Sequence, residues 1–499
     1  MAKKRIKQKR KKSKKKSKKK IQANSEHASL CALAPVIIDK KILEPIHAKV
    51  QIPQKEVLYR PTDKLVFVVL GVVSGCEAVF DLNQSLRVDR PLLRAFGYEK
   101  CADQSVIQGT LNAATGENVQ QLEDALKAIW DENNLTVSLL EKAQREGTVV
   151  TIDMDLSGMP ASKKAEKSEK GYFAGKRNIY GRQLARIVVP ETQEIVTECL
   201  YPGNRLSCKV FKDMVKKMEQ TLPSDTKVQR RLIRLRLDGG FGTDANINYA
   251  LWRGYHLLVK IYSGKRAKVL AKSVQEWVDI SPGSNNTPGQ AGWVSKPHRY
   301  GGKTKQLAIR MPRKKGDGYK YSVLVTTAMN ADIQTTVTDY DGRSGVPESV
   351  FCQDNQGLGM RKRRKRGFVA QQMLTLLNQL AHNLIRWMQK WLTTAVEQSA
   401  MEQSAVEQSA AESSSSDDES DHPGDFVPEN AVLVVKTLNG LGMKRFVRQI
   451  LSVSGRVVMK KGKVLQVILN PLYPLINRIR TAFVALLKPY GITVSLDEI

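Results

Sequence analysis

Three acidic positions that lie far apart along the chain have neighbours that suit phosphodiester chemistry. Asp155 lies with Asp153 in the alternating segment VVTIDMDLS, Asp238 follows LIRLRL and precedes GGFG, and Glu348 lies in TDYDGRSGVPESVF. Carboxylates that are brought together repel one another unless a cation lies between them. Mg²⁺ prefers oxygen ligands and would supply that charge, so the three acids are candidates for one magnesium site.

Such a site has a defined chemistry. Two divalent ions roughly 3.5–4 Å apart can activate a water molecule or a 3′-hydroxyl and stabilise the leaving oxygen during in-line displacement at phosphorus. Mg²⁺ is the expected ion, and Mn²⁺ is an expected substitute because it takes similar oxygen ligands. Ordinary structural roles stay open at this point. Asp153 could form a salt bridge, Asp238 could begin a turn, and Glu348 could stabilise a helix N-terminus.

The elements predicted around the first two acids bring them to one sheet edge. Val150, Ile152 and Met154 alternate with Asp153 and Asp155 as in a half-buried strand. The segments that follow predict a hairpin at 181–204, a helix at 208–222, a strand at 232–238, a helix at 243–253 and a strand at 256–261. Ligands of α/β sheets bind at the carboxyl ends of strands. In this β-β-β-α-β-α-β order, Asp155 and Asp238 are therefore expected to share a site, and the glycines after Asp238 leave room for a nucleic-acid backbone.

Helices are expected before this sheet. Residues 61–146 have helical periodicity, and the apolar segment 65–76 is expected to be a buried helix because a membrane span requires ~18 residues. Asp103 is placed to cap a short helix that turns Val106, Ile107 and Leu111 inward. Neighbouring short helices in a basic chain are typical of a helix-turn-helix DNA reader, and also of plain helical packing.

After the sheet, the composition changes twice. Residues 262–335 are rich in Gly, Pro and turns, and they predict β structure with a hairpin at Asp317-Gly318. Helix is expected to return after Gly367. The repeat that begins AVEQS, together with the Ser/Asp-rich stretch that follows it, predicts a linker without chemistry. Beyond it, a hairpin that turns at Lys461-Gly462 and a helix are expected.

The net charge of the chain indicates which class of partner it binds. The chain has 499 residues with 80 Lys and Arg against 49 Asp and Glu, a net charge of +31. Fourteen of the first twenty residues are Lys or Arg, and such a block is expected to be disordered, whether it binds an anion or serves as a solubilising or targeting appendage. The remaining 66 basic residues still exceed the acidic ones. A polyanion, most simply a nucleic acid, is therefore the expected partner.

Several classes of protein are not expected. No apolar run is long enough for a membrane span, and the N-terminal residues contain no apolar segment of a secretory signal. The six cysteines form no CxxC pair, so neither a zinc site nor a disulfide framework is indicated. The expected location is the cytoplasm.

The segments TIDMDLSG, RLDGGFGT and YDGRSGVPE, in that order and spacing, resemble the DDE transposases of bacterial insertion sequences. The resemblance is to the branch with a Y-R-E-K signature and spans about residues 90–470. It implies an α/β fold: a ribonuclease-H-like mixed sheet with helices on both faces, a β-rich insertion before the last catalytic residue, and an N-terminal helical DNA-binding domain. It also implies association with the bacterial nucleoid.

The resemblance, together with the composition, predicts seven regions. These are a disordered basic tail at 1–25, an N-terminal helical DNA-binding region at 26–146, a catalytic domain in two parts at 147–261 and 336–394, a β-rich insertion at 262–335, a repeat and acidic linker at 395–428, and a small C-terminal α/β region at 429–499.

By resemblance, Asp155, Asp238 and Glu348 are the metal-binding catalytic residues, with Asp153 the second candidate for the first position. Tyr340 and Arg343 are then the signature residues that contact the phosphodiester backbone. Two features depart from the family pattern: four residues rather than three separate Arg343 from Glu348, and the signature Lys falls on Asn355.

Additional DNA contacts are expected from basic and aromatic residues. The run RKRRKR could replace the missing Lys by lining a DNA groove, through Arg361, Lys362, Arg363 and Arg364, or it could form a solvated helix face. Trp293 lies in a polar, basic segment where it could stack on a base. Trp252 could stack on a flipped base, but core packing is the favoured expectation.

The implied function is excision and strand transfer of an insertion sequence. The partners would be double-stranded DNA, namely terminal inverted repeats and target DNA, and a second copy of the chain in a homodimer. A hairpin on the transposon end is the implied intermediate. Two alternatives stay open: a non-catalytic DNA-binding protein derived from a transposase, and a ribonuclease-H-like nuclease that shares the metal site but lacks strand transfer.

Overall fold

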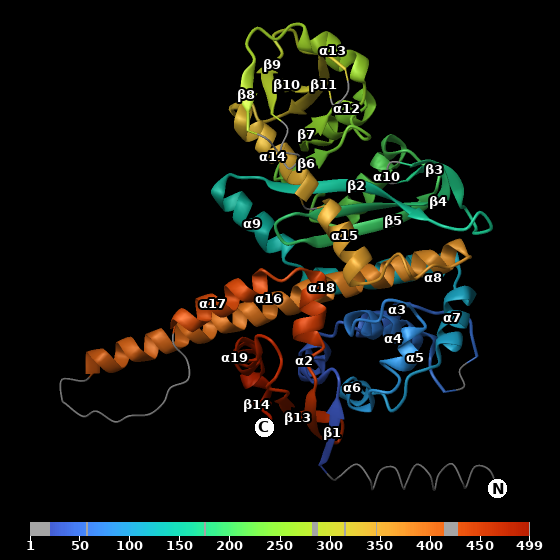
Figure 1. The fold of residues 1–499 in the computed structure, drawn as a ribbon, viewed down its shortest axis with the longest axis vertical. Helices are drawn as coiled ribbons and strands as arrows, with labels where there is room; N and C mark the ends of the chain where they lie inside the picture. Colours follow the sequence, from blue (N-terminus) through green and yellow to red (C-terminus); the bar gives the residue numbers. More distant parts are fainter. Residues whose placement is uncertain are drawn as a thin grey trace. The chain divides into compact units, whose positions relative to one another are not determined.

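The computed structural model describes residues 20–55, 58–173, 176–281, 288–313, 316–345, 347–413 and 428–498 (Figure 1). The chain divides into two units, and each is described by itself. Unit 1 comprises residues 1–129, 353–363 and 380–499, and unit 2 comprises residues 130–352 and 364–379. Within the described part of the chain, none of the helices combines the length and the apolar character that a bilayer crossing requires.

Unit 2 is built on a ten-stranded mixed sheet in the spatial order β3-β4-β2-β6-β7-β11-β10-β9-β8, with β5 paired to β4. Strand β2 is antiparallel to β4 and parallel to β6, and β6 is parallel to β7. The strands are β2 (Val150–Pro160), β3 (Glu169–Phe173), β4 (Lys176–Val189), β5 (Glu194–Pro202), β6 (Ile233–Leu237), β7 (His256–Lys260), β8 (Val278–Ile280), β9 (Gly289–Trp293), β10 (Lys305–Pro312) and β11 (Tyr319–Thr326).

The order of elements predicted for the central sheet is present. Helix α10 (Ser207–Thr221) and the short α11 (Lys227–Arg230) connect β5 to β6, and α12 (Asp244–Arg253) connects β6 to β7. The hydrophobic side chains that the helical periodicity puts on one face of α10 are buried, including Val210, Met214 and Met218. Helix α9 (Thr136–Glu146) precedes β2.

The β-rich region after β7 extends the same sheet. Strand β11 pairs with β7 in antiparallel register, with Leu324 opposite Lys260, and β10 and β11 form the hairpin predicted at Asp317-Gly318. Helix α13 (Gly264–Ala271) packs on β10 and β11. Because main-chain hydrogen bonds join β11 to β7, strands β7 to β11 are held as one surface.

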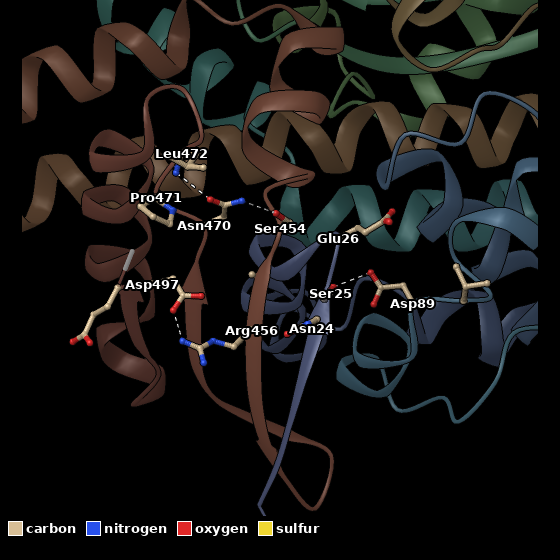
Figure 2. Close-up of a pocket in the computed structure, with 13 residues that line it drawn as sticks. Asn24, Ser25, Glu26, Asp89, Ser454, Arg456, Asn470, Pro471, Leu472 and Asp497 are labelled. Carbon is tan, nitrogen blue, oxygen red and sulfur yellow. Dashed lines mark hydrogen bonds and ion pairs between the residues drawn. The ribbon is translucent and has the colours of Figure 1, made fainter.

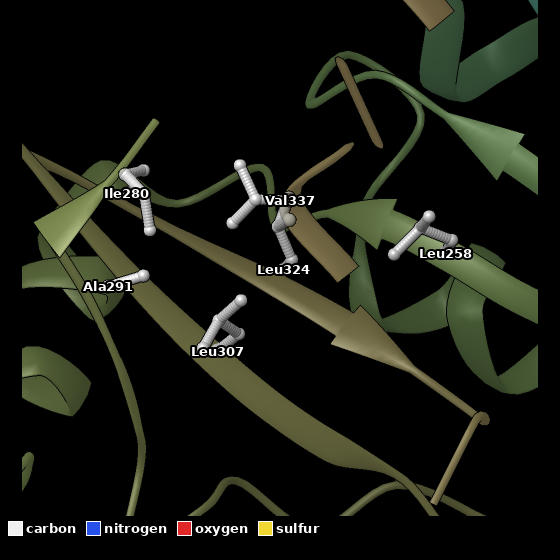
Figure 3. Packing of buried hydrophobic residues seen from close by; sticks show 6 residues of the cluster. All are labelled: Leu258, Ile280, Ala291, Leu307, Leu324 and Val337. Atoms are coloured by element: carbon white, nitrogen blue, oxygen red, sulfur yellow. The ribbon is translucent and has the colours of Figure 1, made fainter. Parts of the chain in front are cut away.

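Helix α14 (Ile333–Gly345) lies on one face of this extended sheet. Val337 packs into an apolar cluster with Leu258, Ile280, Ala291, Leu307 and Leu324, from five strands (Figure 3). Ile333 and Tyr340, one helical turn away on either side of Val337, pack against the same cluster. This spacing fixes the axial position and the rotation of α14, and therefore the place of Arg343, one further turn along.

Two more helices follow α14. Helix α15 (Pro347–Gly357) begins at a proline, a residue that suits the first position of a helix because it lacks an N–H group. Helix α16 (Phe368–Ser413) continues through the AVEQS repeat. Ala, Glu and Gln are good helix formers, which explains the continuation.

Unit 1 contains a four-stranded sheet in the order β1-β12-β13-β14, formed by β1 (Ile21–Ser25), β12 (Gly455–Lys460), β13 (Lys463–Leu469) and β14 (Thr493–Leu496). Two predicted boundaries are wrong here. The disordered tail cannot reach residue 25, because β1 pairs with β12, and residues 1–19 lie outside the described part. The C-terminal region is not a separate piece, because its sheet includes the N-terminal strand β1.

The other elements of unit 1 are helical. They are α2 (Ala28–Asp39), α3 (Glu44–Lys49), α4 (Pro61–Val73), α5 (Asp81–Gln84), α6 (Arg90–Ala95), α7 (Gln104–Ala113), α17 (Pro428–Asn439), α18 (Met443–Phe446), the π-helix η1 (Val447–Leu451), α19 (Ile476–Leu487) and the 3-10 turn η2 (Lys488–Tyr490), while α8 (Gly116–Asn133), α15 and α16 each belong partly to both units. Helix α4 is buried along its length, as predicted. Asp103 caps α7 as predicted, and Ile107 and Leu111 are buried, but Val106 is 45% exposed.

Candidate active site

Asp155 and Asp238 occupy equivalent positions on neighbouring parallel strands. The register pairs Asp153 with Arg236 and Met154 with Leu237; Asp155 is the next residue of β2, and Asp238 directly follows the end of β6. Their backbones are therefore about one strand spacing apart, ~4.8 Å. Residues two apart on a strand point to the same face, so Asp153 and Asp155 share one face with Arg236 and Asp238.

The two candidate aspartates of β2 have different surroundings. Asp153 is fully buried, and Arg236 holds both of its carboxylate oxygens, donating from Nε to Oδ1 and from Nη2 to Oδ2 at 2.7 Å each. Burial raises the pKa of Asp153, and the hydrogen bonds and charge of Arg236 act in the opposite direction. Asp155 is only partly buried. Of the two, Asp155 is therefore the more exposed residue.

Two arginines of β6 attach α14 to this face. Arg236 donates from Nη1 to the main-chain oxygen of Asp339 at 2.5 Å, and Arg234 donates to Asp339 Oδ2 at 2.6 Å. Arg234 also donates to Thr151 Oγ1 on β2. Arg236 thus bridges Asp153 and α14, so β2, β6 and α14 form one rigid frame beside Asp155 and Asp238.

Tyr340 and Arg343, the predicted signature residues, lie on α14 next to the aspartates. The Arg343 guanidinium carbon lies 5.9 Å from the centre of the Tyr340 ring. Burial acts to lower the pKa of Arg343, but Tyr340 and the three carboxylates Asp155, Asp238 and Asp153 together raise it above its usual value. Burial raises the pKa of Tyr340 to about 12, against the influence of Arg343. At neutral pH this corner of the site therefore presents a fixed cation and a protonated hydroxyl.

Asp238 begins a tight turn in which glycine lets the turn approach the main chain of β7 closely. Its Oδ1 accepts a hydrogen bond from Gly240 N at 2.9 Å. At Gly242 a Cβ atom would lie 1.9 Å from the carbonyl oxygen of Lys260, so only glycine fits against β7 there. The interpretation that all these glycines make room for a nucleic-acid backbone is therefore wrong for Gly242.

Helix α15, whose first turn carries Glu348, packs on the same sheet face. Val350 packs with Val188 and Ile195, and the Phe351 ring lies over the guanidinium of Arg186 at 4.4 Å. Arg186 is paired across β4 and β2 with Asp155. The side chain of Glu348 lies outside the described part of the chain. Among the described residues, no three His, Cys, Asp or Glu side chains gather as a set of metal ligands.

The two departures from the Y-R-E-K pattern fall in α14 and α15. Between Arg343 and Glu348, α14 ends at Gly345 and α15 begins at Pro347. Asn355, at the place of the signature Lys, is partly buried near the end of α15 and carries a buried Oδ1 without a hydrogen-bond partner among the described residues.

The basic run 361–366 does not form one exposed surface. Arg363 is 5% exposed and donates to the main-chain oxygens of Cys76 and Glu77. The prediction that it lines a DNA groove is therefore wrong. Lys362 pairs with Glu77, and Lys365 is buried, while Arg361 and Arg364 are exposed and keep the prediction open.

Two tryptophans differ from their predicted settings. Trp293 ends strand β9, packs partly buried against the apolar cluster beneath α14, and has Lys305 Nζ 3.8 Å from its ring centre. It is thus a framework residue of a strand rather than a loop side chain. Trp252, expected in the core, is 67% exposed on α12 beside Tyr249.

Arg234 and Arg236, which build the frame, were not among the predicted site residues. Arg234 and Arg236 alternate with leucines in LIRLRL, and that alternation already indicated two cations on the sheet face that bears Asp238. Their partners on β2 and α14 lie 83 to 105 residues away in sequence, so no local signal identifies them.

Comparison with known proteins identifies the family of the chain. Residues 15–408 match the family model described as Transposase DDE domain group 1. No curated protein matches the chain. Among solved structures, the cryo-EM structure of a piggyBac transposase synaptic complex with hairpin DNA is similar, with 14% identity, a TM-score of 0.41, and coverage of 74% of this chain and 77% of that chain. Because the family match extends over most of the chain, the protein belongs to the DDE transposases of group 1 and is an enzyme of DNA cleavage and strand transfer.

Proposed function

We propose that this transposase moves a bacterial insertion sequence, of the branch with the Y-R-E-K signature, through a metal site formed by Asp155, Asp238 and Glu348. The observation that carries the proposal is the parallel pairing of β2 with β6, which puts Asp155 beside Asp238 on the face covered by α14 and α15. The central strand order β5-β4-β2-β6-β7, antiparallel then parallel, supports a ribonuclease-H-like assignment. Double-stranded DNA is the proposed substrate.

The residues present fit a divalent metal. Asp155 and Asp238 offer partly exposed carboxylates one strand spacing apart, and such hard oxygen donors suit Mg²⁺ or Mn²⁺. Asp238 is held in place by Gly240, and α15 carries Glu348 over the same sheet face. Asp153 is less suited, because Arg236 already occupies both of its oxygens. When bound, two such ions would supply Lewis-acid activation of the nucleophile and the leaving oxygen.

The protein's own groups position the DNA strand. Arg343, a permanent cation beside both aspartates, would bind a phosphate oxygen next to the scissile bond. Tyr340, protonated at neutral pH, would donate a hydrogen bond to the same backbone. The Arg236 bridge between Asp153 and Asp339 would hold α14, and therefore both residues, at a constant distance from the carboxylates.

The proposed reaction has two displacements at phosphorus. In the first, a water oxygen attacks at the transposon end and the P–O3′ bond breaks, which leaves a free 3′-hydroxyl. In the second, that hydroxyl attacks another phosphodiester and the displaced strand leaves with its own 3′-oxygen. An attack on the opposite strand would close a hairpin, and an attack on target DNA would insert the element. Two ends must be held together, so a homodimer is the proposed assembly.

The test is cleavage of a duplex that carries the terminal inverted repeat flanking the coding region. Asp238→Asn should still shift this duplex in a gel and should lose Mg²⁺-dependent cleavage, because it keeps the turn but removes the carboxylate charge. The wild-type chain should cleave with Mg²⁺ or Mn²⁺ and not with EDTA. Cleavage by Asp238→Asn at the wild-type rate would overturn the assignment.

A supercoiled target in the same reaction separates the proposal from its rivals. Joined products establish strand transfer and exclude a simple ribonuclease-H-like nuclease. Hydrolysis without joined products would favour that nuclease. Binding without either reaction would favour a non-catalytic DNA-binding protein derived from a transposase.

A further inference from the structure

Lys260 lies in one row with the two proposed catalytic aspartates. Strands β6 and β7 are parallel, with Arg236 opposite Leu258 and Leu237 opposite Val259, and Asp238 and Lys260 are the next residues. The same step aligns Asp238 with Asp155 on β2. Asp155, Asp238 and Lys260 therefore stand side by side. Asp238 and Lys260 lie at the carboxyl ends of β6 and β7, where α/β sheets bind ligands, and Asp155 lies where the pairing of β2 with β6 ends.

Lys260 points to the face that carries the aspartates. Leu258, two residues earlier on β7, packs in the cluster beneath Val337 of α14 (Figure 3). Alternate residues of a strand share a face, so Lys260 projects toward α14 as Leu258 does. Asp341 and Arg343, both on α14, interact electrostatically with its ammonium group, which agrees with this direction.

The stem of Lys260 passes along the Asp238 turn. A Cβ atom at Gly239 would lie 3.7 Å from both Cγ and Cδ of Lys260, and β11 covers the other side of β7 through the pairing of Leu324 with Lys260. The aliphatic stem is thus held between a neighbouring strand and a glycine turn. This arrangement brings the ammonium group beside Asp238 rather than into free solvent.

The ammonium group of Lys260 has no direct partner among the described residues. The residue is half-buried, and its side chain forms no hydrogen bond or ion pair there. Burial lowers its pKa, Lys320 and Arg343 act in the same direction, and Asp238 and Asp341 oppose them. A partly buried cation without a hydrogen-bond partner is unfavourable. A lysine in this setting beside an active site is therefore suited to bind an anionic group of the substrate.

We propose that Lys260 binds a non-bridging oxygen of the scissile phosphate and stabilises the charge that develops there during displacement. This inference rests on the proposed function. The ammonium group is a compact charge with three donors, and it approaches from β7, across the row from β2. Arg343 approaches from α14, so the phosphate is held by two cations from two elements. The place of the signature Lys is occupied by Asn355, and Lys260 supplies a cation from a part of the chain that the signature does not include.

The experiment compares Lys260→Met, Lys260→Arg and the matched control Lys268→Met, an exposed lysine of α13, under single-turnover conditions on the terminal-repeat duplex. Lys260→Met should reduce the cleavage rate about 100-fold, as expected for loss of one charge-stabilising donor. Lys260→Arg should recover to within about 10-fold of the wild type, and Lys268→Met should cleave normally. The wild type and Asp238→Asn are run beside them.

A second readout separates phosphate binding from a structural role. The slope of log K against log [salt] for end binding, measured with EDTA, should fall by about 0.9 in Lys260→Met, the value for one lost phosphate contact, and should not change in Lys268→Met. The inference is overturned if Lys260→Met cleaves at the wild-type rate, or if Lys260→Met and Lys260→Arg lose activity equally together with a lower melting temperature. If the wild type itself does not cleave, both the proposed function and the role of Lys260 are wrong. If the wild type cleaves and only the Lys260 variants differ from their expected results, the proposed function still stands.

Discussion

Arg236 binds Asp153 through two hydrogen bonds of 2.7 Å, and this pair connects the elements that form the site. The pair is buried, and Arg236 continues to the main-chain oxygen of Asp339 on α14. It therefore joins β2, β6 and α14 at one point. The same pairing distinguishes two aspartates on one face of β2: Asp153 is buried and bound by Arg236, whereas Asp155 is only partly buried.

Arg236→Met should destabilise the protein strongly. The substitution leaves the carboxylate of Asp153 buried without its cation, and breaking a buried pair in this way typically costs ~3–5 kcal/mol of unfolding free energy. Urea denaturation followed by circular dichroism measures the change. Arg87→Met is the matched control, because Arg87 forms an exposed pair with Asp103 and its loss should change the unfolding free energy by less than about 1 kcal/mol. Equal midpoints for the two variants would contradict the role given to Arg236.

Asp155→Asn and Asp153→Asn should have different effects. Removing the charge of Asp155 relieves repulsion with Asp238 and also loses attraction to Arg343, so stability should change little while metal-dependent cleavage is lost. Asp153→Asn should lower the unfolding free energy because the Arg236 charge is left without its partner. Thermal melting and the cleavage assay on the same two variants decide the matter. A stable and fully active Asp155→Asn enzyme would remove Asp155 from the metal site.

Local patterns predicted the elements that depend on neighbours in sequence. The alternation around Asp155 gave strand β2, Asp103 caps α7, and the hairpin turns at Lys461-Gly462, where both residues have positive φ. Turn chemistry, capping and strand alternation are properties of a few consecutive residues, so a single sequence is enough to identify them.

Sequence patterns did not predict contacts between residues that are far apart along the chain. Nothing near Ile21 indicates that it pairs with Met459, and Arg363 reads as part of a charged run although its guanidinium is enclosed by the carbonyls of Cys76 and Glu77. Trp252 has helical spacing suited to packing, yet no element covers it among the described residues. Burial of a residue depends on the whole fold, which short-range periodicity does not contain.

The pH dependence of stability should include a contribution from His256 on β7. Its Nδ1 lies 3.1 Å from Thr327 Oγ1. Burial, followed by the charges of Arg231 and Arg234, lowers the pKa of His256. The unfolded chain therefore takes up a proton on this residue, near pH 6.5, before the folded chain does, and the unfolding free energy should fall as the pH drops below about 6.5. His256→Gln should flatten that part of the curve, as measured by urea unfolding at several pH values; an unchanged slope would exclude His256 as its source.

Removal of residues 1–19 should weaken non-specific DNA binding and reduce its salt dependence. Most of these residues are Lys or Arg, and each phosphate they neutralise contributes about 0.9 to the slope of log K against log [salt]. Fluorescence anisotropy with a random duplex at several salt concentrations measures the slope. The cleavage rate at saturating DNA should not change, because the carboxylates and Arg343 remain. An unaltered slope would show that the segment does not contact phosphate.

Gly242→Ala and Gly239→Ala test how closely the Asp238 turn fits β7. At Gly242 an added Cβ would lie 1.9 Å from the main-chain oxygen of Lys260, and the backbone there cannot move freely because Tyr262 N donates to Gly242 O at 2.8 Å. At Gly239 the nearest protein atom to an added Cβ would be 3.5 Å away, an ordinary contact. Overpacking of a rigid site costs ~1–3 kcal/mol, so Gly242→Ala should lower the urea midpoint clearly.

The paired variant is the internal control for that prediction. Gly239→Ala leaves the Asp238 turn and the Lys260 stem in place, so its unfolding free energy and its cleavage rate should stay close to those of the wild type. Gly242→Ala displaces the carbonyl of Lys260, and since Lys260 stands beside Asp238, cleavage should fall even at temperatures where the variant is fully folded. If both variants unfold at the same midpoint, the close approach of the turn to β7 does not limit stability, and the fixed spacing of Asp238 and Lys260 would need another cause.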